Sequence, residues 1–295
     1  MSRRLKAVSF PPLKTRFNIV PTIIRDAASL QKVLNGVQPA LTPTMGCLHE
    51  GHLSLVRKAR KLSKINVVSI YVNPAQFAPH EDFSEYPRDL KADCRRLEGL
   101  ADIVFAPKNL YPQPQTVHVA LPPLAGELCG HSRPGFFEGV SLAVCKLFNC
   151  VRPCAAVFGK KDFQQLHIVQ LLASQMNYPV RIVAAPIIRE SDGLAMSSRN
   201  AYLTADERAR APLLRQTLRA AAAEVTGGQP PKTAAKNAKV RLRKSGFAPD
   251  YVEARDYATL GAPQSGKKIV LLAAAVLGKA RLIDNIECTA KEKRR

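Results

Sequence analysis

Short apolar runs alternate with longer segments at helical spacing through the first two thirds of this chain. The apolar runs cover residues 37–43, 66–72, 103–106, 155–158 and 180–184, and segments at helical spacing cover 89–97, 140–151 and 164–176. Another begins after the first run, where Leu55, Val56, Ala59 and Leu62 recur at spacings of three and four residues. Strands that alternate with helices pair in parallel and are covered on both faces. The alternation therefore predicts an α/β fold with a mostly parallel sheet.

The character of the chain changes after Asn200. Thr204 and Glu207 form the pattern of a capping box, in which each side chain satisfies an exposed backbone N–H at a helix start, and a long Ala-, Leu- and Arg-rich helix is expected to follow. Strand-like runs at 251–255 and 267–277 come after the Gly-Gly and Pro-Pro pairs of residues 227–231. We therefore expect two domains, 1–188 and 189–295, of which the second is a smaller α+β unit.

The charge balance is strongly basic, with 44 Lys and Arg against 23 Asp and Glu, a net charge of +21. Such an excess suggests a nucleic-acid partner, because clustered cations release counterions from a phosphate backbone. The excess is concentrated in an N-terminal arm (1–17), an acid-free stretch around 232–244 and the tail 291–295. Charge runs at chain ends and linkers are usually solvated surface, so we expect no specific nucleic-acid partner.

Composition also disfavours membrane and secreted proteins. The longest apolar run, 269–277, falls far short of the ~18 residues that a membrane span needs. The odd count of 7 cysteines, without a Cys-x-x-Cys pair, argues against a disulfide scaffold and for a reducing compartment, so we predict a cytoplasmic location. A secretory signal is not expected, whereas a mitochondrial transit peptide stays open, although Pro11 and Pro12 would break its amphipathic helix.

The stretch 42–54 reads TPTMGCLHEGHLS and places His49 and His52 directly after an apolar run. Zinc proteases use His-Glu-x-x-His, which is one residue longer and lacks the glycine, so we expect no protein-built metal site here. A phosphate site fits better, because Pro43 closes the strand, Gly46 lets the backbone approach a ligand, and helix N-termini attract anions. Both imidazoles could then donate hydrogen bonds to a transition state. The alternative is that both histidines only cap the helix.

This strand, His-x-Gly-His and helix arrangement resembles the nucleotidylyltransferase superfamily, which includes class I aminoacyl-tRNA synthetases. The whole run 43–55 resembles the pantoate–β-alanine ligase (pantothenate synthetase) family in particular. Further matching stretches are Val72-Asn-Pro-Ala-Gln76-Phe77, Tyr86-Pro87-Arg88, Arg133-Pro134-Gly135-Phe136-Phe137, Gly159-Lys160-Lys161-Asp162-Phe163-Gln164-Gln165, Asp192-Gly-Leu-Ala-Met196-Ser197-Ser198-Arg199-Asn200 and Arg281-Leu-Ile-Asp284-Asn285. The resemblance covers roughly residues 18–288.

The resemblance implies a Rossmann-like nucleotide-binding domain and a C-terminal lid domain that closes over the nucleotide. It implies that ATP and Mg²⁺ activate the carboxylate of pantoate as pantoyl adenylate, with release of pyrophosphate. The amine of β-alanine would then displace AMP and form the amide of pantothenate. It also implies a homodimer, as in other members. The composition predicts no membrane partner.

The resemblance further implies the site residues. The catalytic residues would be His52, as the principal one, with His49, Lys161 and Arg199. The nucleotide would be bound by Met45, Gly46, His49, His52, Gly159, Lys161, Asp162, Ile188, Met196, Ser197, Ser198 and Arg199. The other substrates would be bound by Gln76, Gln165, Arg133 and Tyr86.

The chemistry of these residue types agrees with those roles. Gln76 and Gln165 can each donate and accept, which suits a substrate with hydroxyls and a carboxylate. Lys161 is a compact cation that can follow phosphate charge, and Asp162 suits magnesium or ribose, although such a pair can also be surface ions. Ser197, Ser198 and Arg199 offer hydroxyl donors and a planar cation for phosphates.

Two positions depart from the family pattern. Lys160 stands where Glu is usual, and Phe136 where bacterial members commonly have His; both variants resemble plant members, so we expect no loss of activity. The rival hypothesis is a basic nucleic-acid-binding protein that has kept the fold and lost catalysis. The intact set of His49, His52, Lys161 and Arg199 favours the enzyme.

Overall fold

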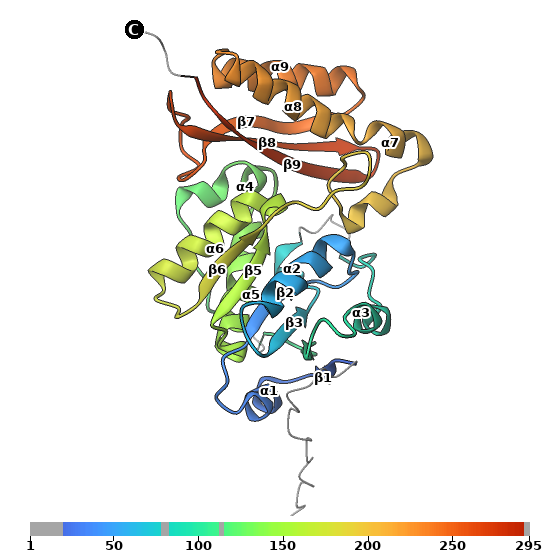
Figure 1. Ribbon diagram of the computed structural model, residues 1–295, viewed down its shortest axis with the longest axis vertical. Coiled ribbons are helices and arrows are strands. Elements are labelled where there is room, and N and C mark those ends of the chain that lie inside the picture. The colour runs from blue at the N-terminus through green and yellow to red at the C-terminus, as the bar shows by residue number, and fades with distance from the viewer. Residues whose placement is uncertain (1–19, 78–82, 112–114, 292–295) are drawn as a thin grey trace, which may run out of the picture.

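The computed structural model describes residues 20–77, 83–111 and 115–291 (Figure 1). The basic arm expected at 1–17 and the last four residues of the tail lie outside the described residues. The first part of the chain contains six strands, β1 (Thr22–Ile24), β2 (Ala40–Thr44), β3 (Asn66–Ile70), β4 (Ile103–Phe105), β5 (Ala155–Gly159) and β6 (Arg181–Ala185).

Helices cover both faces of this sheet. They are α1 (Ala27–Leu34), α2 (Glu50–Arg60), α3 (Leu90–Arg96), the short α4 (Cys129–Ser132), α5 (Phe136–Val151) and α6 (Phe163–Gln175), with the 3-10 turns η1 (Pro74–Gln76), η2 (Pro123–Gly126) and η3 (Lys160–Asp162). Successive strand residues point to opposite faces. Leu41 and Val67 therefore pack with α1, α5 and α6, whereas Val68 and Val104 pack with α2 and α3.

The strand order is β1-β4-β3-β2-β5-β6, and every neighbouring pair is parallel. The order reverses between β2 and β5, because the chain runs outward from β2 through β3 and β4 on one side and from β5 to β6 on the other. Open parallel sheets bind ligands at the carboxyl ends of the strands at such a switch point. The prediction of a parallel α/β sheet is confirmed, and the topology predicts a ligand site at the carboxyl ends of β2 and β5.

A second sheet lies beyond the first, formed by β7 (Ala248–Asp256), β8 (Lys268–Leu277) and β9 (Ala280–Thr289) in antiparallel order (Figure 1). Leu271 and Ala273 of β8 pack with α8 (Leu213–Thr226) and α9 (Pro231–Lys244). Leu272 of β8 faces the other way and packs with Phe163 of α6. β8 is therefore buried on both faces, which explains its continuous apolar sequence, and the smaller α+β unit is confirmed.

The connection between the two sheets contains η4 (Ser198–Tyr202) and α7 (Ala205–Arg210). Thr204 and Glu207 form the expected capping box, with the backbone N–H of each bonded to the side chain of the other at 2.9 and 3.3 Å. The single long helix expected after it is wrong, because the helix ends at Arg210 and α8 starts separately. Pro212 explains the break, since proline has no N–H to continue the helical ladder.

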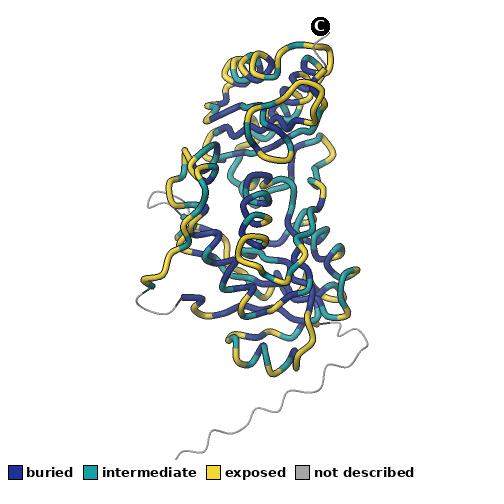
Figure 2. The backbone as a smooth tube through the Cα atoms, turned by 90° about the vertical axis from the view of Figure 1, so that its left-hand side faces the viewer, coloured by how far each residue is buried: buried dark blue, intermediate teal, exposed yellow. Residues whose placement is uncertain are grey.

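Burial follows the two sheets. In Figure 2 the buried backbone runs through the interior of both parts, and exposed stretches follow the outer turns. Within the described residues, no helix combines the length and the apolar composition that crossing a bilayer requires. The division at residues 188 and 189 stays a prediction, although the two sheets make separate cores.

Candidate active site

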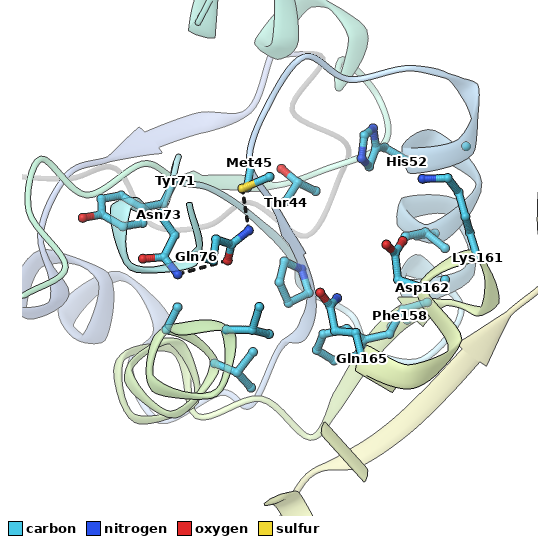
Figure 3. Close-up of a pocket in the computed structure, with 18 of the residues that line it drawn as sticks. Thr44, Met45, His52, Tyr71, Asn73, Gln76, Phe158, Lys161, Asp162 and Gln165 are labelled. Carbon is cyan, nitrogen blue, oxygen red and sulfur yellow. Dashed lines mark hydrogen bonds between the residues drawn. The ribbon is translucent and has the colours of Figure 1, made fainter. Parts of the chain in front are cut away.

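A cavity of about 250 Å³ opens at the carboxyl ends of β2 and β5, at the switch point of the sheet (Figure 3). Its walls come from the segments that follow β2, β3, β5 and β6, with one side of α5 as an apolar floor. A larger hollow of about 770 Å³ adjoins it and extends to the second sheet. The two share Arg133, Phe136, Lys161, Asp162, Gln165 and Arg199, so the hollow continues the cavity toward the second part of the chain.

The loop after β2 is held by a buried carboxylate. Asp93 of α3 accepts hydrogen bonds from the backbone N–H of Cys47 at 3.0 Å and of Leu48 at 2.8 Å. Gly46 has a positive φ of 85°, and a Cβ there would lie 2.8 Å from Oδ2 of Asp93. Burial raises the pKa of Asp93. Sequence reasoning missed this residue, because an acid in an ordinary helical segment gives no signal of what its side chain will meet.

His49 and His52 stand at the start of α2 and bond to its backbone. Nδ1 of His49 accepts from the N–H of Gly51 at 3.1 Å, and Nδ1 of His52 accepts from the N–H of His49 at 3.4 Å. A neutral imidazole that accepts at Nδ1 carries its proton on Nε2. The helix-capping alternative and a catalytic role are therefore compatible, since capping fixes the tautomer and leaves one N–H donor on each ring for a ligand.

Both imidazoles are neutral at neutral pH. Burial, helped by the nearby Lys161 cation, lowers the pKa of His49 to about 4. Burial, helped by the neighbouring His49, lowers the pKa of His52 to about 3. The two residues can thus act as hydrogen-bond donors without carrying a charge of their own.

Lys161 and Asp162 follow β5 in the turn η3. Figure 3 places Lys161 on the same wall of the cavity as His52, with Asp162 beside it. Asp162 immediately precedes α6, but in the described chain its carboxylate does not cap that helix. The turn therefore offers the cavity one cation and one carboxylate.

The opposite wall is a connected set of polar side chains. Nδ2 of Asn73 donates to Oε1 of Gln76 at 3.0 Å, and Nε2 of Gln76 donates to Sδ of Met45 at 2.7 Å (Figure 3). Asn73 is itself fixed by donation to the carbonyl of Gly139 at 3.0 Å and by acceptance from the hydroxyl of Tyr111 at 2.5 Å. Sequence reasoning singled out Gln76 and missed Asn73, although its place directly after a strand was a usable signal.

Arg133 and Phe136 form the rim near Gln76. The guanidinium carbon of Arg133 lies 3.7 Å from the ring centroid of Phe136, and its Nη2 donates to the carbonyl of Gln76 at 3.1 Å. Arg stacks readily on aromatic faces. The departure from the family pattern at Phe136 thus supplies a platform that orients Arg133 beside the cavity.

Most residues expected from the sequence are brought together. The cavity is lined by Met45, His49, His52, Gln76, Arg133, Gly159, Lys161, Asp162, Gln165, Ile188, Met196 and Arg199. Gly46 lies behind them in the loop, and Ser197 lines the adjoining hollow, where its Oγ accepts from the N–H of Arg199 at 3.3 Å. Ser198 lies in η4, outside the cavity lining.

Tyr86, which is expected to bind substrate, does not line the cavity. It is buried, and its ring meets Phe77 edge-on at 5.8 Å between centroids. Phe77, not Tyr86, lines the cavity.

A doubly wound parallel sheet with a His-x-Gly-His turn at its switch point defines the class of protein as an α/β nucleotide-binding enzyme. Residues 22–287 match the family described as Pantoate-beta-alanine ligase. Pantothenate synthetase from Thiobacillus denitrificans is 50% identical over 275 residues, which are 91% of this chain and 97% of that relative. The chain belongs to the pantoate–β-alanine ligase family.

Solved structures agree with this assignment. Pantothenate synthetase from Thermus thermophilus is 38% identical, with a TM-score of 0.84 over 91% of this chain and 99% of that one. The ligase from Francisella tularensis, solved in complex with β-γ ATP and β-alanine, is 30% identical, with a TM-score of 0.76 over 90% and 97% of the two chains. The resemblance stated from the sequence and the prediction of a ligase are both confirmed.

Proposed function

We propose that the cavity joins pantoate and β-alanine to pantothenate, with ATP cleaved to AMP and pyrophosphate. A carboxylate oxygen of pantoate attacks the α-phosphorus of ATP, and the bond to pyrophosphate breaks. The amine of β-alanine then attacks the carbonyl carbon of pantoyl adenylate, AMP leaves, and the amine loses its proton. The observation that carries the proposal is the convergence of His49, His52 and Lys161 at the switch point in a chain of this family.

The first step concentrates negative charge on the phosphates. The Nε2–H groups of His49 and His52 are donors held in place by the helix cap, and the ammonium of Lys161 lines the same cavity. Preorganised donors and nearby cations stabilise such charge. Arg199 adds a planar cation from the segment after β6. The positive end of the α2 dipole favours the same charge, and the N–H groups of His49 and Gly51 act on it through the imidazoles to which they are bonded. His52 is the principal catalytic residue in this scheme.

Pantoate lies between Gln76, on the wall opposite these donors, and Gln165 at the start of α6. The amides of Gln76 and Gln165 pair with its hydroxyls and carboxylate, and its methyl groups face the apolar floor formed by Val140 and Val144. The guanidinium of Arg133, oriented by Phe136, lies at the rim where a second carboxylate, that of β-alanine, can approach. Tyr86 supports this wall through Phe77 in place of touching the substrate.

The nucleotide is bound by Met45, Gly159, Lys161, Asp162, Ile188, Met196 and Arg199, with Gly46, Ser197 and Ser198 shaping the loops around it. The residues present fit Mg²⁺, because the Asp162 carboxylate beside Lys161 is left unused as a helix cap. Nucleotide-bound magnesium takes one or two carboxylates together with phosphate oxygens. When bound, it neutralises phosphate charge.

The proposal extends to the assembly and the location of the protein. The protein is a homodimer of chains divided at residues 188 and 189, and the second domain acts as a lid. The seven cysteines are all free thiols, which supports a reducing compartment such as the cytoplasm. Membership of a ligase family favours the enzyme over the nucleic-acid-binding alternative.

The test is a single-turnover reaction of the full chain with ATP and pantoate before β-alanine is added. Pyrophosphate should form in an amount equal to the active sites and only when pantoate is present. Adding β-alanine should then release AMP and pantothenate together. Pyrophosphate that forms equally well without pantoate, or no pyrophosphate at all, would overturn the proposal.

A further inference from the structure

One residue of the second sheet reaches the turn that carries Lys161. Asn285 of β9 is buried, with 4% of its surface exposed. Its Nδ2 donates to the carbonyl oxygen of Lys160 at 2.8 Å and to that of Lys161 at 3.1 Å. These bonds join positions more than 120 residues apart along the chain and connect the second sheet to the backbone of a residue that lines the cavity.

Asn285 is rigidly held on its own side. It pairs with Leu272 in the antiparallel ladder between β8 and β9, and its carbonyl accepts from Nη1 of Arg215 at 3.3 Å. Its backbone N–H donates to Oδ1 of Asp284 at 2.7 Å. Asp284 in turn binds both guanidinium nitrogens of Arg189 at 2.8 and 2.9 Å. Adjacent residues of β9 therefore hold two segments that border the cavity.

Lys160 adds a second attachment from the same turn to the same strand. Its Nζ lies 2.6 Å from Oε1 of Glu287, and Glu287 also pairs with Lys268 at 2.6 Å. The side chain of Lys160 thus faces β9, whereas that of Lys161 faces the cavity. This explains how the chain accommodates a lysine at position 160, since a glutamate there would face Glu287 at close range.

We propose that Asn285 is a positioning residue that fixes the Lys161 ammonium in the cavity by holding the backbone of η3. The proposal rests on the function proposed above. A three-residue 3-10 turn has little rigidity of its own, and a lysine stem is flexible, so the position of its root decides where the charge lies. A displacement of about 1 Å in a catalytic group can cost about 100-fold in rate.

The test compares Asn285→Ala, Lys161→Ala and the double variant in the full chain, through single-turnover pyrophosphate formation from ATP and pantoate. Asn285→Ala should slow adenylation by about 10- to 100-fold while half-saturation by pantoate changes by no more than about twofold. The double variant should be no slower than Lys161→Ala, because Asn285 acts through Lys161. Slowing by Asn285→Ala that multiplies with that of Lys161→Ala would overturn the proposal.

Asn66 provides a matched control. It is fully buried at the start of β3, at the amino ends of the strands and so at the end of the sheet away from the cavity. Its Nδ2 also donates to two carbonyls, those of Val56 and Leu100, both at 3.0 Å. Asn66→Ala should lower the thermal midpoint and leave adenylation by the folded protein within about twofold. Equal slowing by both variants would reduce Asn285 to a structural role and overturn the proposal.

Asn285→Asp keeps the side-chain shape but turns acceptor oxygens toward the two carbonyls, so it carries the same test if the alanine variant does not fold. We expect it to be at least as slow as Asn285→Ala. A folded Asn285→Asp protein that adenylates pantoate at the wild-type rate would overturn the positioning role. A wild-type chain that forms no pyrophosphate would instead overturn the proposed function, so the two failures are distinguishable.

Discussion

The backbone N–H of His49 donates to Nδ1 of His52 at 3.4 Å, and the two imidazole centroids lie 4.1 Å apart. This contact sets the tautomer of His52, because a neutral ring that accepts at Nδ1 must carry its proton on Nε2. A helix cap therefore prepares a hydrogen-bond donor for the cavity, and loss of that donor should be measurable in the first chemical step.

Replacing His52 with alanine removes one preorganised donor. His52→Ala should slow pantoyl-adenylate formation by about 100-fold or more, the scale measured for loss of one oxyanion-type donor. The measurement is single-turnover pyrophosphate release with ATP and pantoate. His131→Ala, which alters an exposed imidazole on α4, is the control and should leave the rate unchanged. A His52→Ala enzyme that keeps a near-normal rate would contradict the role of His52.

The histidine pKa values predict how stability depends on pH. Burial lowers the pKa of His49 from its ordinary 6.5 to about 4 and that of His52 to about 3. Between pH 6.5 and those values the unfolded chain binds more protons than the folded one, so the free energy of unfolding falls as the pH falls through this window. Urea titrations at about pH 7 and about pH 5 measure this change. The free energy of unfolding should fall less between the two pH values in His52→Ala than in the wild-type protein.

The same pKa values can be read directly by NMR. The ring-proton shifts of His49 and His52 in the folded protein should stay constant from about pH 8 down to about 5. The rate of adenylation should likewise not fall near pH 6.5, the ordinary pKa of histidine, through protonation of these rings. Ring shifts that titrate with a midpoint near that value would show that the two imidazoles are not held neutral.

Gln76 and Gln165 should act on pantoate more than on ATP. Replacing either with alanine leaves substrate polar groups unpaired, which costs about 1–3 kcal/mol of pantoate binding. Calorimetry with each ligand measures the split, and the dissociation constant of ATP should change little. Gln170→Ala, at an exposed position of α6, is the matched control. Equal weakening of ATP and pantoate binding would assign these amides to the nucleotide.

Gly139 should tolerate no side chain. A Cβ at this position of α5 would lie 1.9 Å from the carbonyl oxygen of Ala75, in the turn that carries Gln76. Gly139→Ala must push that turn aside, so we expect about 1–3 kcal/mol lower stability and weaker pantoate binding. Chemical denaturation and calorimetry measure the two effects. At Gly126 a Cβ meets nothing within 4 Å, so Gly126→Ala should change neither; similar behaviour of both variants would refute the clash.

Local patterns in the sequence predicted the elements that shape the site. Apolar runs and helical spacing report on burial of neighbouring residues, so they placed β3, expected at 66–72 and found at Asn66–Ile70, and α6, expected at 164–176 and found at Phe163–Gln175. The same patterns gave no sign of β1, whose three residues are too few to show a period. The single helix expected after Thr204 is two helices, because Pro212 has no N–H to continue the helical ladder.

The sequence by itself determined the family, the α/β fold class and a set of candidate residues, because motifs and periodicity are carried by neighbouring positions. The individual roles of those residues stay predictions. Only the tertiary structure decided that Asp93 holds the loop before His49, that Asn73 orders Gln76, and that Asn285 reaches the Lys161 turn. Two of these contacts join elements far apart in the chain, and the third depends on how two side chains near a strand end point. Strand order and register create the two long-range contacts, and neither leaves a spacing in the sequence that could be recognised beforehand.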